Sequence, residues 1–180
     1  ADLARYADDF VFFFERKDDA ERMLEVLPKR FGKYGLALHP DKTRLVPFRR
    51  PDRADGGSDG PGTFDFLGFT HHWGLSRNGK WVVKKRTAKD RFSRTLRRIG
   101  EWCRKHRHDD VEEQHRALAR KLNGHYAYFG VTSNYAALAR LWHETKVIWR
   151  KWLSRRSQKG FLNWAAMQRL LERFPLPKPR

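Results

Sequence analysis

Short stretches of alternating residues open the chain and predict a β-hairpin. Residues 3–6 form a short first strand, and residues 10–14 form a β-branched and aromatic run that is apolar on both faces, which predicts a buried strand. Asp8 and Asp9 lie between them. Because an unpaired carboxylate is costly to bury, we expect residues 7–9 to form the exposed tip of the hairpin.

A helix is predicted next, from a cap at Asp18 to about Gly32, with a kink at Pro28 and an end at Gly35. Residues 36–39 then alternate like a strand, and a turn follows before residues 42–46. The apolar stripe of the helix consists of Ala20, Met23, Leu24, Leu27 and Phe31.

A Gly-, Pro-, Asp- and Arg-rich segment at residues 49–62 predicts a loop. Residues 64–69 alternate as a strand that breaks at Gly68, and an Asn-Gly pair at 78–79 predicts a hairpin between residues 73–75 and 81–83. Adjacent histidines at 71–72 cannot both face one ion from a strand, so we interpret them as surface or nucleic-acid contacts.

Helical spacing governs the second half of the chain. The apolar stripes predict helices at about residues 88–106 and 111–130, a third helix capped by Asn134, and a short fourth helix that starts at Asn163. Asp110 and Glu113 have capping-box spacing. We expect the aromatic residues on these stripes to be core, and prolines 175, 177 and 179 to give an extended tail. The fold class is therefore α+β, with antiparallel hairpins and a helix followed by an all-α bundle of three to four helices.

Charge separates two regions of the chain. The net charge is +18, yet residues 1–75 hold 12 Lys and Arg against 13 Asp and Glu, whereas residues 76–180 hold 27 against 8. The strong positive charge of the second region indicates a polyanionic partner. Nucleic acid is the favoured partner, and an anionic membrane surface is a much weaker alternative. One cysteine, Cys103, excludes an internal disulfide, and no apolar run reaches membrane-spanning length.

The Tyr-Ala-Asp-Asp sequence at residues 6–9 resembles the YxDD signature of reverse transcriptases, and residues 5–10 resemble its form in group II intron reverse transcriptases. The resemblance implies a hairpin on the polymerase palm, where Asp8 and Asp9 hold two Mg²⁺ ions, with Asp8 the principal ligand. It also implies that Tyr6 and Ala7 lie at the nucleotide site. A solvated turn without chemistry is the alternative for the two aspartates.

Two further blocks follow in the family's order. The Gly-Leu-Ala-Leu and Lys-Thr pattern at residues 35–43 resembles an element whose lysine lies near the triphosphate, which implies that Lys42 donates a proton to the leaving pyrophosphate. An exposed turn lysine is the alternative. Phe66, Leu67 and Gly68 resemble the block that holds the primer terminus, for which an ordinary bulge is the alternative.

Residues 124–135 and 149–159 resemble the thumb, or maturase X region, of group II intron proteins. The domains implied are the carboxyl-terminal part of a palm at residues 1–83 and a basic helical thumb at residues 84–180. Basic residues that flank the helix stripes are expected to contact duplex phosphates. They are Arg91, Arg94, Arg98, Lys121, Arg150, Lys151, Arg155 and Arg156.

The expected function is RNA-directed DNA synthesis of the group II intron type, with intron splicing and mobility as accompanying roles. The expected partners are an RNA template, an RNA or DNA primer duplex, dNTP and intron RNA, in the bacterial cytoplasm as part of a ribonucleoprotein. The family's fingers and its first palm aspartate are not found here, so we expect the 180 residues alone to be inactive. An RNA-binding splicing factor with secondary polymerase activity and a domesticated enzyme, CRISPR-associated or retron-like, are the alternatives.

Overall fold

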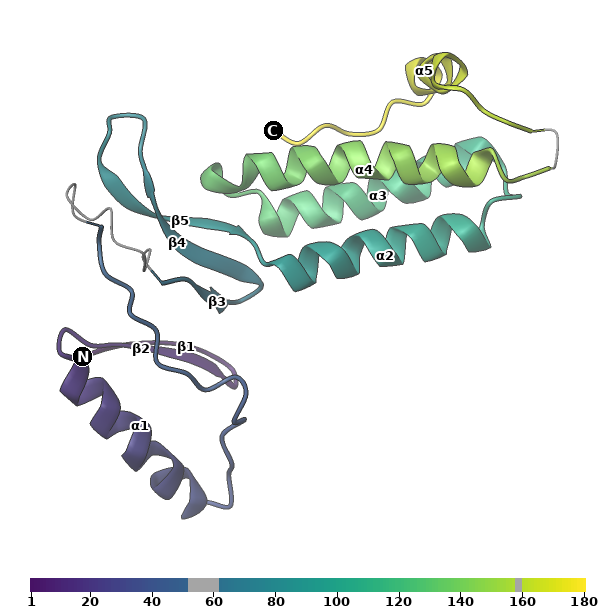
Figure 1. Ribbon diagram of the computed structural model, residues 1–180. Coiled ribbons are helices and arrows are strands. Elements are labelled where there is room, and N and C mark those ends of the chain that lie inside the picture. Colours follow the sequence, from purple (N-terminus) through teal and green to yellow (C-terminus); the bar gives the residue numbers. More distant parts are fainter. Residues whose placement is uncertain (52–61, 158–159) are drawn as a thin grey trace. The chain divides into compact units, whose positions relative to one another are not determined.

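The computed structural model describes residues 1–51, 62–157 and 160–180 and has an α+β fold (Figure 1). The chain divides into two compact units, Ala1–Lys84 and Lys85–Arg180. Most of the loop predicted at 49–62, and the last two residues of the stretch 149–159, lie outside the described residues.

The first unit begins with the predicted hairpin. Strands β1 (Asp2–Tyr6) and β2 (Asp9–Phe13) pair antiparallel, and helix α1 (Lys17–Gly32) covers one face, where Phe10 stacks on Phe31 at a ring distance of 6.0 Å. The prediction of a buried strand is wrong, because the central residues of β2 are half-buried and its ends are exposed. The described sheet has two strands, and a strand is fully buried only when both sheet faces are covered.

The predicted end of α1 at about Gly32 is confirmed, and its predicted start needs one correction. Arg16, and not Asp18, occupies the N-cap position, and its side chain makes no capping hydrogen bond. The Asp18 carboxylate instead lies in the first turn, 3.1 Å from the Arg16 guanidinium. The helix ends at Gly32, and Gly35 follows with a left-handed φ of +68° while its N–H donates to the Gly32 carbonyl.

The strand predicted at residues 36–39 is wrong. This segment is irregular, since alternation alone supplies no pairing partner. The turn predicted after it is confirmed, because the carbonyl of His39 accepts hydrogen bonds from the N–H of Lys42 at 3.2 Å and of Thr43 at 3.0 Å.

A second antiparallel sheet has the order β3-β4-β5, formed by β3 (Phe64–Phe66), β4 (Phe69–Leu75) and β5 (Trp81–Thr87). The hairpin predicted at Asn78-Gly79 is confirmed. Gly79 has φ +68°, and the N–H of Ser76 donates to the Lys80 carbonyl at 2.7 Å.

The second unit contains the predicted helices. They are α2 (Lys89–Lys105), α3 (Val111–Phe129), α4 (Tyr135–Leu153) and α5 (Trp164–Arg173), with a short 3-10 turn at Thr132–Asn134. Their stripes meet in one core, so the aromatic stripe is core as predicted and Trp149 is fully buried. The buried core residues are Ile99, Cys103, Leu118, Leu122, Leu141, Trp149, Leu153, Met167 and Leu176.

The residues that precede α3, α4 and α5 differ in whether their side chains cap the helix. Asn163 caps α5 as predicted, since its Oδ1 accepts from the Ala166 N–H at 2.8 Å. Asp110 caps α3 through the N–H of Glu112 at 2.7 Å, so the bond expected at the N–H of Glu113 is not the one formed. Asn134 precedes α4, but its side chain does not cap the helix.

The buried Asn134 side chain instead joins the end of β5 to the bundle. Its Oδ1 accepts from the Thr87 N–H at 2.8 Å, and its Nδ2 donates to Thr87 Oγ1 at 2.8 Å and to the Phe129 carbonyl at 2.9 Å. Next to it, Ser133 Oγ accepts from the Lys85 N–H at 2.9 Å and donates to the Lys85 carbonyl at 2.7 Å. The position that the sequence marks as a helix cap is therefore a tertiary anchor.

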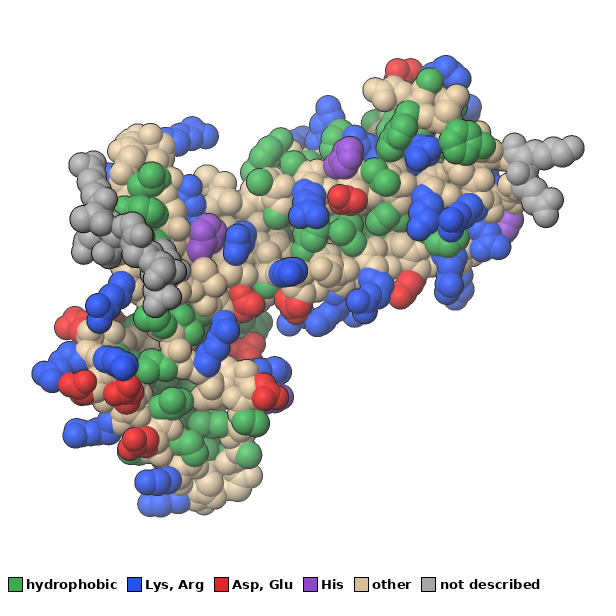
Figure 2. Space-filling view, viewed as in Figure 1, with side chains coloured by type: hydrophobic (Ala, Val, Ile, Leu, Met, Phe, Trp, Pro, Cys, Tyr) green, Lys and Arg blue, Asp and Glu red, His purple; other side chains and the backbone are tan. Residues whose placement is uncertain are grey.

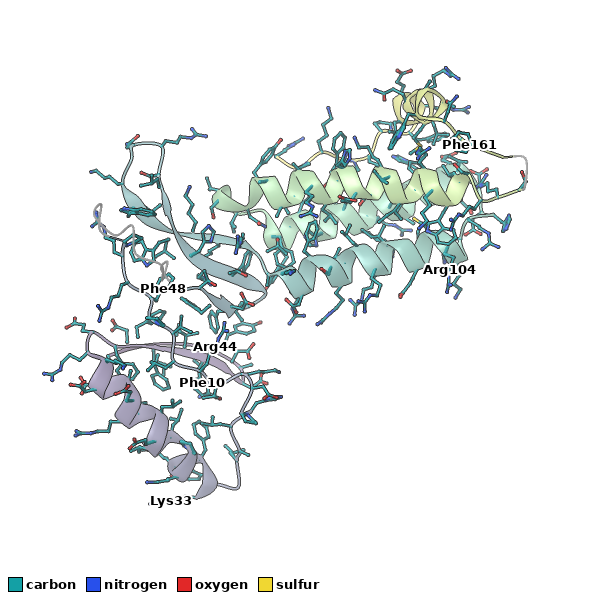
Figure 3. All side chains as sticks on the ribbon, viewed as in Figure 1. Phe10, Lys33, Arg44, Phe48, Arg104 and Phe161 are labelled. Atoms are coloured by element: carbon teal, nitrogen blue, oxygen red, sulfur yellow. The ribbon has the colours of Figure 1, made fainter. Side chains whose placement is uncertain are left out.

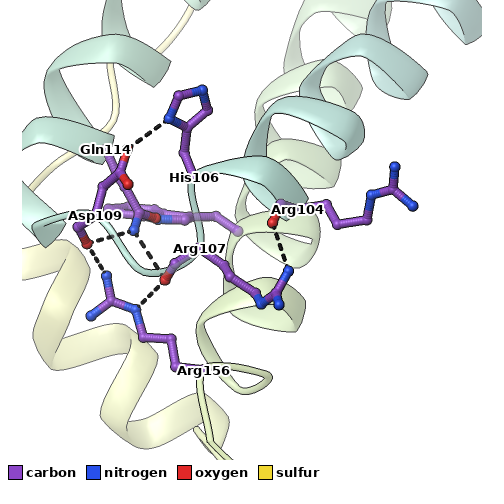
Figure 4. Close-up of polar contacts among 7 residues, drawn as sticks. Arg104, His106, Arg107, Asp109, Gln114 and Arg156 are labelled. Carbon is purple, nitrogen blue, oxygen red and sulfur yellow. Dashed lines mark hydrogen bonds and ion pairs between the residues drawn. The ribbon is translucent and has the colours of Figure 1, made fainter.

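A polar network fixes the connection between α2 and α3 (Figure 4). The buried Gln114 donates from Nε2 to the Asp109 carbonyl at 3.0 Å, and its Oε1 accepts from Trp149 Nε1 at 2.9 Å. Arg156 donates from Nε to the Arg107 carbonyl at 2.5 Å and from Nη2 to the Asp109 carbonyl. These side chains donate hydrogen bonds to backbone carbonyls that have no partner within a helix at this turn.

The proline-rich tail packs back on the bundle. The carbonyls of Pro175, Leu176 and Pro177 lie within hydrogen-bonding distance of ring nitrogen or hydroxyl groups of α3 and α4. The tail is extended as predicted, but Leu176 is buried in the core. The donors are His115 at 2.9 Å, Trp142 at 3.3 Å and Tyr126 at 3.2 Å.

Candidate functional site

The β1–β2 hairpin has a two-residue turn, Ala7-Asp8, because Tyr6 pairs directly with Asp9. Asp9 is therefore the first residue of β2 and not part of the tip. Ala7 has a left-handed φ of 53°, a backbone conformation that costs a non-glycine residue about 1–2 kcal/mol. Arg5 stabilises this turn, since its Nε donates to the Ala7 carbonyl at 3.0 Å, a contact that the sequence analysis did not foresee.

Alternation along the strands places Asp9 on the sheet face away from α1. Phe10 faces α1 through its stack on Phe31, so Asp9 and its cross-strand neighbour Tyr6 point to the opposite face. Tyr6 is 67% exposed, and the Asp8 and Asp9 side chains are exposed as well. The turn and the two strand residues beside it thus present one aromatic ring and two carboxylates to solvent.

The chemistry of this donor set fits an open magnesium site. Among the described residues, neither Asp8 nor Asp9 has a side-chain hydrogen bond or ion pair, so both carboxylates are available to a cation. Mg²⁺ is commonly bound by one or two carboxylates while water and substrate phosphates complete its shell. The described part of the chain contains no group of three or more acidic, His or Cys side chains that could enclose an ion.

An aromatic cluster connects this hairpin to the second sheet. Phe13 of β2 contacts Phe64 of β3 edge-on at 6.2 Å, and Phe64 stacks on His71 at 4.8 Å. Phe48 contacts both Phe64 at 5.0 Å and Trp73 at 5.6 Å. His71 is thus half-buried in ring packing and is not an exposed surface residue, while its contact with nucleic acid stays a prediction. Phe48 could not be predicted from the sequence, because it lies in an irregular segment without a periodic signal.

Leu67 and Gly68 form the turn of the β3–β4 hairpin. Their φ angles are 51° and 76°, and two consecutive left-handed residues are typical of a type I′ hairpin turn. Leucine in this conformation is uncommon, so the turn stores backbone strain. Beside it, Thr70 Oγ1 donates to Asp65 Oδ1 at 2.5 Å across the strands. Leu67 and Gly68 therefore form a strained two-residue turn, and the hydrogen bond between Thr70 and Asp65 links the two strands next to it.

Lys42 lies in the turn after α1. Its side chain is exposed, and no described hydrogen bond or ion pair holds it in place. The structure does not bring Lys42 into contact with either carboxylate of the first hairpin.

Figure 2 shows blue Lys and Arg side chains spread over α2 and the rest of the helical unit. Arg91, Arg94 and Arg98 recur at helical spacing on α2 and are all exposed. Arg91 and Arg94 share the Asp90 carboxylate at 3.8 and 3.4 Å, contacts that count for little at an exposed surface. These three side chains can reach a ligand without losing a buried contact.

The other five basic candidates divide by the contacts they make. Lys121 lies 5.4 Å from the Trp102 ring centre, and Lys151 and Arg155 lie 5.7 and 5.3 Å from that of Trp152. All three are exposed. Arg150 and Arg156, in contrast, are half-buried, and both donate to backbone carbonyls. Both guanidinium groups therefore hold backbone carbonyls, a structural contact that no sequence pattern predicted.

The comparison with protein families found a match within the first unit. Residues 1–71 match the family described as reverse transcriptase (RNA-dependent DNA polymerase). This match spans the aspartate hairpin, Lys42 and the Leu67-Gly68 turn. Searches of curated proteins and of solved structures gave no match. Within the described residues, no helix is long and apolar enough to cross a membrane. The match covers 71 of the 180 residues, so the similarity to reverse transcriptases is shown for this part of the chain.

Proposed function

We propose that the chain is the carboxyl-terminal palm, residues 1–83, and the thumb, residues 84–180, of a group II intron-type reverse transcriptase. One observation carries the proposal. Asp8, in the two-residue turn, and Asp9, the first residue of β2, are both exposed, and both lie inside the region that matches the reverse transcriptase family. Aspartates with a purely structural role in or beside a turn would be expected to accept local hydrogen bonds, and neither side chain accepts one among the described residues.

In this proposal, template-directed synthesis joins the primer 3′ oxygen to the α-phosphorus of a dNTP as the bond from that phosphorus to pyrophosphate breaks. Two Mg²⁺ ions bound at the tip would lower the pKa of the 3′-hydroxyl and neutralise charge on the leaving group. Asp8 is the principal ligand and Asp9 the peripheral one. The hydroxyl proton passes to solvent, and Lys42 protonates the leaving pyrophosphate.

The neighbouring residues position the substrates. Tyr6 shares a sheet face with Asp9, so its exposed ring borders the metal ligands and lines the nucleotide site with Ala7. In the second hairpin, Phe66, Leu67 and Gly68 hold the primer terminus. A glycine at the second turn position leaves room for the sugar-phosphate backbone to approach.

The thumb binds the template–primer duplex through its phosphates. Arg91, Arg94 and Arg98 are the leading contacts because they are exposed on one helix, with Lys121, Lys151 and Arg155 supporting them. Arginine suits this role, since its guanidinium forms forked hydrogen bonds to phosphate oxygens.

The test is Asp8→Asn in the intact protein, with Asp2→Asn as the matched control. Asp2 is an exposed aspartate at the other end of the same hairpin, opposite Phe13. Primer extension should fall by on the order of a thousandfold in Asp8→Asn, because metal charge stabilisation is worth several kcal/mol and about 1.4 kcal/mol is tenfold. RNA binding should be unchanged, since phosphate contacts elsewhere supply the affinity.

Metal binding gives a readout that does not depend on activity. Titration of Mn²⁺ followed by electron paramagnetic resonance should show weaker binding in Asp8→Asn than in Asp2→Asn. Primer extension near the wild-type rate in Asp8→Asn would show that the aspartate hairpin is not the catalytic site.

A second function, assistance of intron RNA splicing, is favoured by the charge of the second half, with 27 Lys and Arg against 8 Asp and Glu in residues 76–180. A basic surface of this size can bind folded RNA without any polymerase chemistry. The same Asp8→Asn protein separates the two functions. Splicing of the intron RNA should continue in this variant while DNA synthesis is lost.

A further inference from the structure

Exposed aromatic rings gather where α4 passes into α5. Phe161 is 78% exposed and Trp164 is 45% exposed, and only two residues lie between them along the chain. Figure 3 labels Phe161 on the segment that leads into α5. Single exposed apolar residues are common, but large rings grouped on a surface indicate a binding site.

The backbone that carries Phe161 is fixed by its neighbour Leu162. The Leu162 N–H donates to Ser154 Oγ at 3.1 Å, and its carbonyl accepts from Arg150 Nη1 at 3.0 Å. Leu162 also packs against the helical core, and Asn163 caps α5. The exposed ring of Phe161 is therefore held on an anchored segment, which lowers the entropy lost when a ligand binds.

Cations accompany the aromatic rings. The Arg150 guanidinium lies 4.4 Å from the ring centre of Trp164, and its buried Nε has no hydrogen-bond partner among the described residues. Lys151, the next residue of α4, and Arg155, just past the end of α4, lie 5.7 and 5.3 Å from the ring centre of Trp152. Positive charge and π-faces thus share this surface.

Acidic residues do not balance these cations. Residues 145–180 contain ten Lys and Arg and one acidic residue, Glu172. Every ion pair found in the described residues lies at or before Glu144. The surface therefore complements an anion, and its aromatic rings favour a ligand that also has planar faces.

We propose that this surface binds the unpaired nucleotides of a single-stranded nucleic acid. Bases stack on the exposed rings while the cations neutralise the phosphates between them. A duplex does not fit this description, because its bases are stacked on one another and offer no free face. The α4–α5 site consists of Arg150, Lys151, Trp152, Arg155, Phe161 and Trp164.

The α4–α5 site deepens the proposed function and rests on it, since it adds single-strand binding to the duplex contacts assigned to α2. In Figure 1, α5 and α2 lie on opposite sides of α4. The helical unit can therefore hold a duplex on one side and the unpaired strand that continues from it on the other.

The test compares a double variant, Phe161→Ala with Trp164→Ala, with the control Tyr135→Ala in the full 180-residue chain. Tyr135 is 56% exposed at the opposite end of α4, so the control also removes an exposed ring. Fluorescence anisotropy measures binding of an oligouridylate, an oligothymidylate and an RNA duplex, each about a dozen nucleotides or base pairs long. Circular dichroism checks that each variant keeps its helices.

The double variant should bind the single strands about tenfold or more weakly, because removing a stacked ring weakens binding at each base. Its affinity for the duplex should change by less than about twofold, and its salt dependence should be unaltered, since no phosphate contact is removed. Trp164→Phe should keep most of the single-strand affinity. Equal losses on the two oligonucleotides would assign the site to single strands regardless of sugar.

Unchanged single-strand affinity in the double variant, or an equal loss of duplex and single-strand binding, would overturn the α4–α5 site. Neither result affects DNA synthesis by the aspartate hairpin, which Asp8→Asn tests separately. Conversely, an active Asp8→Asn enzyme would refute the polymerase assignment and leave a measured single-strand site in place.

Discussion

Replacing Asn134 by alanine should destabilise the protein far more than the loss of a helix cap. The side chain makes three hydrogen bonds, at 2.8, 2.8 and 2.9 Å, and is buried. Each such bond contributes about 1 kcal/mol net, and the Thr87 N–H left behind in the interior adds the cost of lost solvation. We expect the free energy of unfolding to fall by about 3–4 kcal/mol.

Asn163→Ala is the matched control, since it is the same substitution at another residue that precedes a helix. Asn163 is exposed and makes one capping bond, whose loss should cost about 1 kcal/mol. Denaturant unfolding followed by circular dichroism and tryptophan fluorescence measures both free energies of unfolding. Equal costs for the two variants would refute the conclusion that Asn134 anchors β5.

Three further predictions concern chemistry, binding and pH. Lys42→Ala should slow the single-turnover chemical step more than it weakens dNTP binding; a change confined to the apparent Kd would exclude proton donation. Replacing Arg91, Arg94 and Arg98 by glutamine should make the plot of log duplex affinity against log salt concentration less steep, by the amount expected for the loss of about three phosphate contacts. An unaltered slope would show that α2 is not part of the interface. Burial lowers the pKa of His125 from its ordinary 6.5. The unfolded state therefore takes up this proton first, and stability should fall as pH drops below about 6.5. His125→Phe should reduce that loss in pH-dependent unfolding experiments, and an identical pH profile would contradict the assignment.

The sequence predicts those elements correctly whose structure depends on residues close together in the chain. The hairpin at Asp8 and Asp9, the turn at Gly79 and the four helices of the second unit all follow from alternation, turn chemistry or helical spacing. The α5 cap at Asn163 was predictable for the same reason, because a cap involves residues within one turn.

Features that depend on distant partners were not predictable. Residues 36–39 alternate as a strand does, but pairing decides whether a strand forms, and the pattern cannot supply a partner. Asn134 has the local context of a cap, whereas two of its three hydrogen bonds are made with Thr87, 47 residues away. In the same way, Arg150 and Arg156 look like free surface cations until the fold brings carbonyls to them.

The packing of the proline-rich tail affects how the protein folds during its synthesis on the ribosome. Its contacts reach back 60 residues from Pro175 to His115 and 51 from Pro177 to Tyr126. The core position filled by Leu176 is therefore open while α2, α3 and α4 are already synthesised. Until the tail emerges, the nascent bundle exposes part of its apolar interior, which is the state most prone to aggregation and to chaperone capture.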